Sequence, residues 1–168
     1  GRLVLAHVVE LPKVSSEGAI SAVGGVKAEE LLGMTENTDP VRGERVVAAV
    51  AMPSPDDDGQ PAPLALGTHN GVVKRWNRES PTTMDSWSVI DLKDGDAVIA
   101  AAEARDNDRL VFVSTDSSLL TFEAKNVRPQ GRTAGGMAGI RLADGCTVAA
   151  FAVVPADKVA WNYEEGEN

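Results

Sequence analysis

The chain has very little cysteine, few aromatic residues and no long apolar run, and each shortage excludes a class of protein. A single cysteine, Cys146, among 168 residues excludes an internal disulfide framework and is typical of a reducing compartment. Phe, Trp and Tyr make up 4% of the chain, so the core has to be built mainly from Val, Leu, Ile and Ala. No apolar run could cross a bilayer, and no basic-then-apolar secretory segment opens the chain. We therefore expect a cytoplasmic protein with no membrane partner.

Residues that carry catalytic or metal chemistry are equally scarce. The two histidines, His7 and His69, lie far apart, and His69 directly precedes the turn pair Asn70-Gly71. Cys146 has no histidine nearby and sits in an apolar run, where cysteine usually acts as a small hydrophobe. The acidic run Asp56–Asp58 lacks the regular spacing of a cation-binding loop. We predict no catalytic residue, no metal site and no cofactor in this chain.

What the chain does have is a repeat with a period of about 50 residues. The matching halves are residues 64–75 and 92–100 in the first copy and residues 110–122 and 142–150 in the second. A weaker trace at residues 1–4 and 41–48 indicates that the chain begins inside a further repeat. Such a period is typical of units that are too small to bury their own apolar face and have to pack on one another.

Within each repeat the pattern is that of β-structure. Asn70-Gly71 supplies the positive φ angles of a tight hairpin turn, and residues 115–118 carry turn chemistry at the same place in the second copy. Asp94-Gly95 and Asp144-Gly145 each precede an apolar run, as turns that enter strands do. Helical periodicity is confined to Val26–Leu32. The fold class that this predicts is all-β.

We expect propeller-like blades, in about three four-stranded repeats. The predicted blades are residues 1–52, 63–104 and 109–154, followed by an acidic tail or linker at residues 155–168. The repeat predicts three pairs of equivalent residues, namely Thr68 with Thr115, Gly95 with Gly145 and Val98 with Val148. The tryptophans Trp76, Trp87 and Trp161 are expected to pack between blades or at the rim.

The charge is distributed unevenly. The net charge of −9 argues against a nucleic-acid partner for the chain as a whole. Residues 63–142, however, carry 10 basic and 10 acidic residues, and the stretch from Lys125 to Arg141 contains no acid. The acidic residues gather instead in Asp56–Asp58 and in the tail at residues 164–167, where they favour solubility. A basic surface could therefore exist on an acidic protein.

The candidate nucleic-acid-binding residues form two basic groups. They are Lys74, Arg75 and Arg78 at the end of a predicted hairpin strand, and Lys125, Arg128, Arg132 and Arg141 in the acid-free stretch. The second group lies in a glycine-rich segment, residues 127–142, in which the backbone could approach a partner closely. That segment is either an inter-strand loop with incidental arginines or an anion-binding loop. We expect residues 128–139 to be exposed at the rim and residues 56–61 to be mobile.

Together these motifs resemble the C-terminal domain of the A subunit of bacterial DNA gyrase and topoisomerase IV. The resemblance covers about residues 1–154 and is carried by Thr68, Gly71, Val73-Lys74-Arg75, Leu92, Gly95-Asp96 and residues 127–142, with further matches at Gly1–Val4, Glu10-Leu11-Pro12 and Arg42–Val46. The gyrase-specific box Gln-Arg-Arg-Gly-Gly-Lys-Gly is absent; Gln130 to Gly136 is a degenerate version. Such versions are found in other gyrase blades and in topoisomerase IV, so both relatives stay open.

The resemblance implies a β-pinwheel, a disc whose blades exchange strands and whose basic rim bends DNA. It implies a DNA-wrapping module of a type II topoisomerase that assists ATP-dependent supercoiling or decatenation at the nucleoid. The implied partners are double-stranded DNA, a second A subunit and the topoisomerase B subunit, in an A2B2 enzyme. ATP and Mg would act through other domains. The nucleophilic tyrosine of that enzyme lies elsewhere, so the sole tyrosine here, Tyr163, does not take its role.

Two function classes remain from the sequence. Residues 15–40 lack the arginines that the resemblance leads one to expect, so the rim of that blade should contribute little to DNA binding. The alternative to a DNA-wrapping module is a non-catalytic propeller that binds proteins, as the net acidity would favour. The position of the arginines decides between them: one outer edge favours DNA, whereas scattered or acid-paired arginines favour a protein partner.

Overall fold

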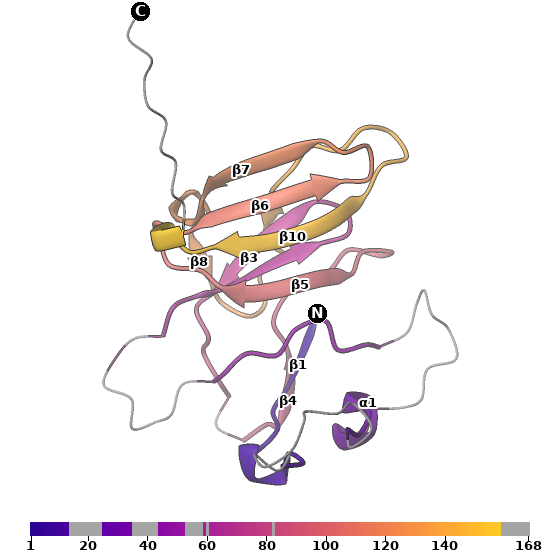
Figure 1. Cartoon of the computed structure of the whole chain (residues 1–168), viewed down its shortest axis with the longest axis vertical. Coiled ribbons are helices and arrows are strands. Elements are labelled where there is room, and N and C mark those ends of the chain that lie inside the picture. Colours follow the sequence, from indigo (N-terminus) through magenta and orange to yellow (C-terminus); the bar gives the residue numbers. More distant parts are fainter. Residues whose placement is uncertain (14–24, 35–43, 53–58, 60, 82, 159–168) are drawn as a thin grey trace, which may run out of the picture.

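A computed structural model describes residues 1–13, 25–34, 44–52, 59, 61–81 and 83–158, drawn in colour in Figure 1. The acidic tail from residue 159, Tyr163, Trp161 and most of residues 56–61 lie outside the described residues. In the described part of the chain the regular structure is mostly strand. The helical pieces are α1 (Ala28–Leu31), which falls within the predicted helix, and three 3-10 turns, η1 (Val8–Glu10), η3 (Ala124–Asn126) and η4 (Ala156–Lys158). The all-β prediction is confirmed.

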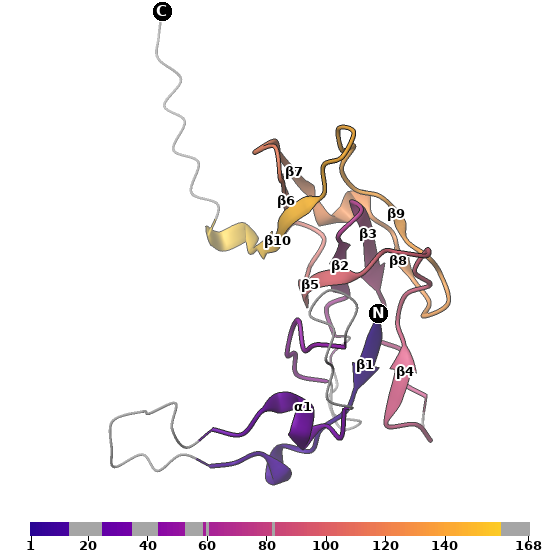
Figure 2. The same ribbon diagram turned by 90° about the vertical axis from the view of Figure 1, so that its right-hand side faces the viewer.

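The strands form three sheets that follow one another along the molecule (Figure 2). The two-stranded sheet pairs β1 (Arg2–Val4) with β4 (Ser86–Ser88). The central sheet has the order β5 (Val98–Glu103), β2 (Leu64–Thr68), β3 (Val72–Trp76) and β8 (Pro129–Gln130), with β9 (Met137–Ala138) also on β3. The third sheet has the order β10 (Val148–Val154), β6 (Arg109–Ser114) and β7 (Leu119–Glu123).

The predicted repeat is present in the strand register. Val98 pairs with Thr68 and Val148 with Ser114, each beside a β-bulge, which confirms that Val98 and Val148 are equivalent. Gly95 and Gly145 are equivalent too, because both adopt positive φ in the turn that precedes these strands.

One predicted pair is wrong by one residue, since the residue equivalent to Thr68 in the second repeat is Ser114 and not Thr115. The hydroxyl of Thr68 accepts a hydrogen bond from the amide of Val72, and the hydroxyl of Ser114 accepts one from Ser118. Residue type was misleading here because Thr and Ser cap a hairpin turn equally well.

Strands are exchanged between successive repeats. β4 lies on β1 with Ser88 opposite Arg2, and β9 lies on β3 with Ala138 opposite Val72. Because Ser88 and Ala138 occupy the same place in two repeats, each repeat lends this strand to the repeat before it. The strand pairing therefore crosses the boundary between the contiguous blades predicted at residues 63–104 and 109–154. Periodicity predicts which residues form strands but not which neighbour they pair with.

The core forms two apolar clusters that join the sheets. In one, Phe112 of β6 packs against Phe151 of β10, with ring centroids 4.8 Å apart. In the other, Trp76 of β3 meets Trp87 of β4 edge-on at 6.3 Å. Both tryptophans are buried, which confirms their predicted packing role. A few aromatic residues placed at the junctions between sheets thus support a core that is otherwise aliphatic.

Candidate nucleic-acid interface

The first of the two predicted basic groups is buried. Lys74, Arg75 and Arg78 have exposed fractions of 0%, 1% and 4%. The sequence placed them at the open end of a hairpin strand, but β3 is enclosed by β2 on one side and by β8 and β9 on the other. The strand exchange that closes over β3 is the reason for Lys74 and Arg75, whereas Arg78 is enclosed by contacts with residues 51, 62 and 103. These three cations cannot reach a phosphate in this structure.

Arg75 instead holds the turn between two repeats together. Its guanidinium donates to the carbonyl oxygens of Ala104 (2.9 Å), Ala124 (3.1 Å) and Val127 (3.2 Å). It also forms an ion pair of 2.7 Å with Asp106. The two carbonyls at residues 124 and 127 lie directly before β8, so Arg75 sets the point from which the exchanged segment departs.

Lys74 contacts the same exchanged segment farther along. Its Nζ donates to the carbonyl oxygens of Arg132 (3.1 Å) and Ala134 (2.6 Å). Burial lowers the pKa of Lys74, and the negative charge of Asp91 partly opposes this shift. Two backbone carbonyl groups therefore stabilise the buried ammonium group, because the negative ends of their dipoles point toward it.

Arg78 anchors a different region. It forms an ion pair of 2.6 Å with Glu103 and donates to the carbonyl oxygens of Ala51 and Ala62. Its backbone adopts positive φ (60°), which is uncommon outside glycine. Arg78 thus connects the end of β5 to the chain that enters β2, away from the contacts of Lys74.

The second basic group lies on the surface. Arg128, Arg132 and Arg141 are exposed, and within residues 83–158 none of them has an ion-pair partner. Lys125 is exposed as well, but it is paired with Glu123. The predicted exposure of residues 128–139 is confirmed for its arginines, while some of its small residues are half-buried against β3.

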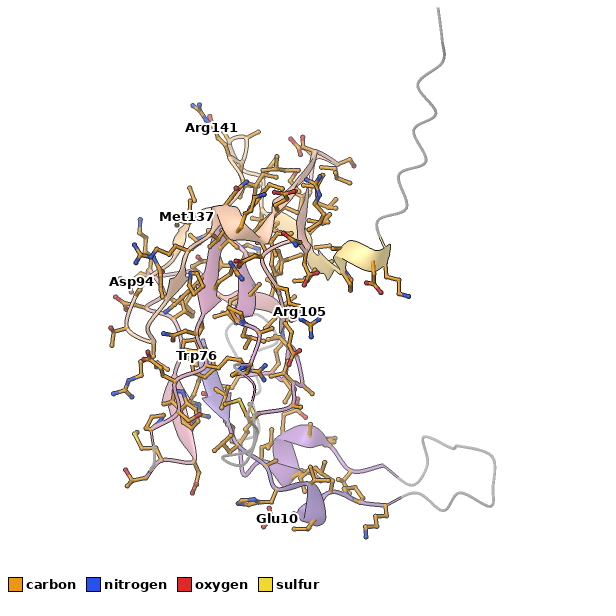
Figure 3. The ribbon with its side chains drawn as sticks, turned by 90° about the vertical axis from the view of Figure 1, so that its left-hand side faces the viewer. Glu10, Trp76, Asp94, Arg105, Met137 and Arg141 are labelled. Carbon is orange, nitrogen blue, oxygen red and sulfur yellow. The ribbon has the colours of Figure 1, made fainter. Side chains whose placement is uncertain are left out.

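The three arginines follow one edge of the central sheet. Arg128 precedes β8, which runs parallel to the end of β3, and Arg132 lies in the turn that follows. The segment then returns as β9 along the beginning of β3, and Arg141 comes three residues after it. In Figure 3 Arg141 projects from a loop beyond Met137, on the side of the molecule that also carries Asp94. We call residues 128–141 the basic edge.

Glycine is required where the basic edge crosses β3. Gly136 adopts positive φ (81°), and a Cβ added there would lie 2.6 Å from the carbonyl oxygen of Val73. The backbones therefore approach more closely than any other residue would permit. This close approach is what allows the Lys74 ammonium to reach the carbonyls of the turn.

One cation at this site was not among the predicted residues. Lys93 lines a hollow of about 220 Å³ together with Val72, Gly135 and Gly136. Asp91 and Asp96 line it too, so the hollow carries both signs of charge. The signal in the sequence was the turn Asp94-Gly95, which follows Lys93 directly, but only the fold brings that turn beside the basic edge.

The repeat before the one that supplies the basic edge has no corresponding run of exposed positive charge. Residues 78–91 occupy the same place in that repeat, and there Asp91 stands where the later repeat has Arg141. Its one cation, Arg78, is buried, whereas Glu79, Asp85 and Asp91 are exposed. Only one of these two exchanged segments could therefore attract a polyanion.

Replacing Asp91 by arginine should increase the affinity for duplex DNA about fivefold and steepen the slope of log affinity against log salt by about 0.9. The physical reason is that the substitution removes a carboxylate beside the basic edge. It also places an arginine where the later repeat has Arg141. Asp157→Arg makes the same change in charge on η4, which Figure 3 shows on the opposite side from Met137 and Asp94. Equal gains from both variants, measured by fluorescence anisotropy, would mean that net charge alone is responsible.

No cluster of metal ligands comes together in the part of the chain that the structure describes. Within that part no three His, Cys, Asp or Glu side chains gather as metal ligands, and no helix is long and apolar enough to cross a membrane. His69 is exposed, with Nδ1 3.3 Å from the side-chain oxygen of Asn70 in the turn. The basic edge is the candidate site, because its three exposed arginines present positive charge to an anion.

Comparisons with known proteins agree with this structure. The family described as "DNA gyrase C-terminal domain, beta-propeller" matches residues 108–155. The chain is 31% identical over 122 residues to the A subunit of DNA gyrase from Haloquadratum walsbyi, covering 71% of this chain and 14% of that protein. It is 29% identical over 147 residues to the A subunit of DNA gyrase from Mycolicibacterium smegmatis, covering 84% and 16%. The chain belongs to the gyrase A C-terminal domain family.

Solved structures support the fold of this gyrase-type domain. The C-terminal domain of DNA topoisomerase IV matches with a TM-score of 0.55 and 21% identity, over 60% of this chain and 32% of that one. The DNA gyrase A C-terminal domain matches with a TM-score of 0.50 and 24% identity, over 58% and 32%. The β-pinwheel expectation is thereby confirmed. The chain spans only 14% and 16% of the two curated relatives.

Proposed function

We propose that this chain binds duplex DNA along the basic edge and bends it, as a wrapping module in the A subunit of a type II topoisomerase. The observation that carries the proposal is the position of Arg128, Arg132 and Arg141, exposed along one edge segment without ion-pair partners in the described residues. Arginine presents a rigid set of donors that fits phosphate oxygens. An edge that follows a strand could place several guanidinium groups along one DNA backbone.

The energetics of such binding are dominated by phosphate contacts. Bending DNA by 40–90° costs on the order of 1–6 kcal/mol, which several neutralised phosphates could offset. Contacts to the phosphate backbone position a protein without reading the bases, so we propose little sequence preference. The rest of the chain is acidic enough to give the whole a net charge of −9, and it would keep DNA away from other faces.

In the proposed enzyme this module presents a DNA segment for strand passage. The reaction would require the breakage-reunion region, a second A subunit and the B subunits, in an A2B2 assembly in the bacterial cytoplasm at the nucleoid. ATP and Mg would be bound by those other parts, and this chain would contribute DNA binding without a catalytic residue. The gyrase A relatives support this proposal.

A protein-binding propeller is the second candidate, and one observation favours it. Arg75 and Arg78 are not on an outer edge but are paired with Asp106 and Glu103. The two basic groups therefore do not merge into one continuous surface. If the chain does not bind duplex DNA at low salt, the protein-binding function takes precedence.

Wrapping can be separated from simple binding by DNA topology. The intact topoisomerase subunit would be incubated with relaxed plasmid, the plasmid would be nicked and resealed, and the linking number would be read from the topoisomer distribution after the protein is removed. Wrapping should shift the distribution in one direction in proportion to bound protein. Saturating binding with an unshifted distribution would contradict wrapping while leaving DNA binding intact.

A further inference from the structure

We propose that Lys74 is a positioning residue that turns two backbone amides of the basic edge, those of Thr133 and Gly135, toward a phosphate group of bound DNA. This inference rests on the proposed function and adds a phosphate site built from backbone groups. Lys74 itself is fully buried and contacts no solvent, so it acts only through the segment that it holds.

The orientation follows from peptide geometry. In a trans peptide the carbonyl bond and the next N–H bond point in opposite directions. Lys74 Nζ draws the carbonyl oxygens of Arg132 and Ala134 inward, so the amides of Thr133 and Gly135 point away from the core. The amide of Asp91 reinforces this by donating to the same Ala134 oxygen at 3.3 Å.

These amides are free to bind. Among the backbone hydrogen bonds of the described residues, neither the Thr133 nor the Gly135 amide has an acceptor. The amide between them differs, because Ala134 donates to the carbonyl oxygen of Gly131 at 3.3 Å. Two outward N–H groups beside the exposed Arg132 guanidinium make a set of donors that suits a phosphate oxygen.

The surrounding charges set the strength of this site. Lys93 lies beside Gly135 and Gly136 and adds a positive charge, while Asp91 and Asp96 line the same hollow and oppose it. Asp96 is already engaged, since its carboxylate accepts from the amides of Asn70 and Ala97. The inferred ligand is therefore a single phosphate group of DNA. Arg132 and the two backbone amides contact it together, so charge alone does not hold it.

The first test uses the wild-type chain and NMR. Titration with a short duplex should move the amide proton resonances of Thr133 and Gly135 downfield, with Ala134 moving less because its amide is already bonded. A parallel titration with inorganic phosphate probes the site without DNA. Shifts with phosphate alone would support the phosphate site and contradict the DNA-binding function, whereas no selective shift with either probe would overturn the inference.

The second test replaces Lys74 by methionine, which preserves the stem and removes the donors. Duplex affinity should fall about tenfold, because the amides of Thr133 and Gly135 are then no longer held toward the phosphate. The slope of log affinity against log salt should stay the same, because no charged contact to phosphate is removed. A slope shallower by about 0.9 would mean that Lys74 contacts a phosphate directly, and that result would overturn the positioning role.

Arg78→Met is the matched control. It also removes a buried cation that donates to backbone carbonyls, but those carbonyls belong to residues 51 and 62, outside the basic edge. Its duplex affinity should equal that of the wild type. An equal loss in both variants would show that general destabilisation is responsible, and unchanged affinity in Lys74→Met would likewise overturn the inference. Lys74→Arg, which retains donors, should restore part of the affinity.

Discussion

Replacing Arg128, Arg132 and Arg141 together by alanine should make the salt dependence of duplex binding shallower by roughly 3 units in the log–log slope. Each arginine that neutralises one phosphate releases counterions and contributes about 0.9 to this slope. At low salt the loss of affinity should exceed that of the Lys74 variants. The measurement is a salt titration of duplex binding by fluorescence anisotropy, on two unrelated DNA sequences.

The control removes the same charge from other faces. Arg45, Arg105 and Lys158 are exposed, and Figure 3 shows Arg105 on the opposite side from Met137 and Asp94. Replacing these three by alanine should leave the slope nearly unchanged. Replacing the pair Arg42 and Arg45 should also matter little, because Glu44 and its acidic segment cancel their attraction for phosphate. An unchanged slope in the basic-edge variant, or a loss confined to one sequence, would favour a protein partner.

Replacing Arg75 by methionine should lower the free energy of unfolding by about 3 kcal/mol. The substitution removes the donor that satisfies the carbonyls of Ala104, Ala124 and Val127 in a buried position. The ion pair with Asp106 contributes less, because the Asp106 side chain is 71% exposed and can be solvated by water. Urea unfolding followed by tryptophan fluorescence, which reports on the buried Trp76 and Trp87, provides the measurement.

Arg105→Met is the control for that experiment. The Arg105 side chain is exposed on the same inter-repeat turn, so its loss should change the free energy of unfolding by less than about 0.5 kcal/mol. A loss below about 1 kcal/mol in Arg75→Met would show that water replaces the guanidinium at these carbonyls. The central and third sheets would then be held together mainly by the apolar cluster that joins Ala65 and Val73 to Phe112 and Phe151.

The second basic group could be predicted from the sequence because its neighbours are informative. Four glycines and no acid between Lys125 and Arg141 favour an exposed cationic segment. The first basic group gave no such local signal. Lys74 and Arg75 lie in a strand pattern that is compatible with one exposed face, and no residue near them in sequence indicates that another repeat will cover it.

The sequence by itself determined the β-structure and the repeat, because strand periodicity and turn chemistry are local. Asn70-Gly71, Asp94-Gly95 and Asp144-Gly145 each require a particular backbone conformation whatever surrounds them. Only the tertiary structure decided which edge each strand joins, since β9 could pair within its own repeat or with β3 and the pattern of residues is the same. That choice buried Lys74 and Arg75 and left Arg128, Arg132 and Arg141 in solvent. Burial of a charge depends on contacts between residues that are 50 or more positions apart, such as Arg75 with Val127, which no local pattern encodes.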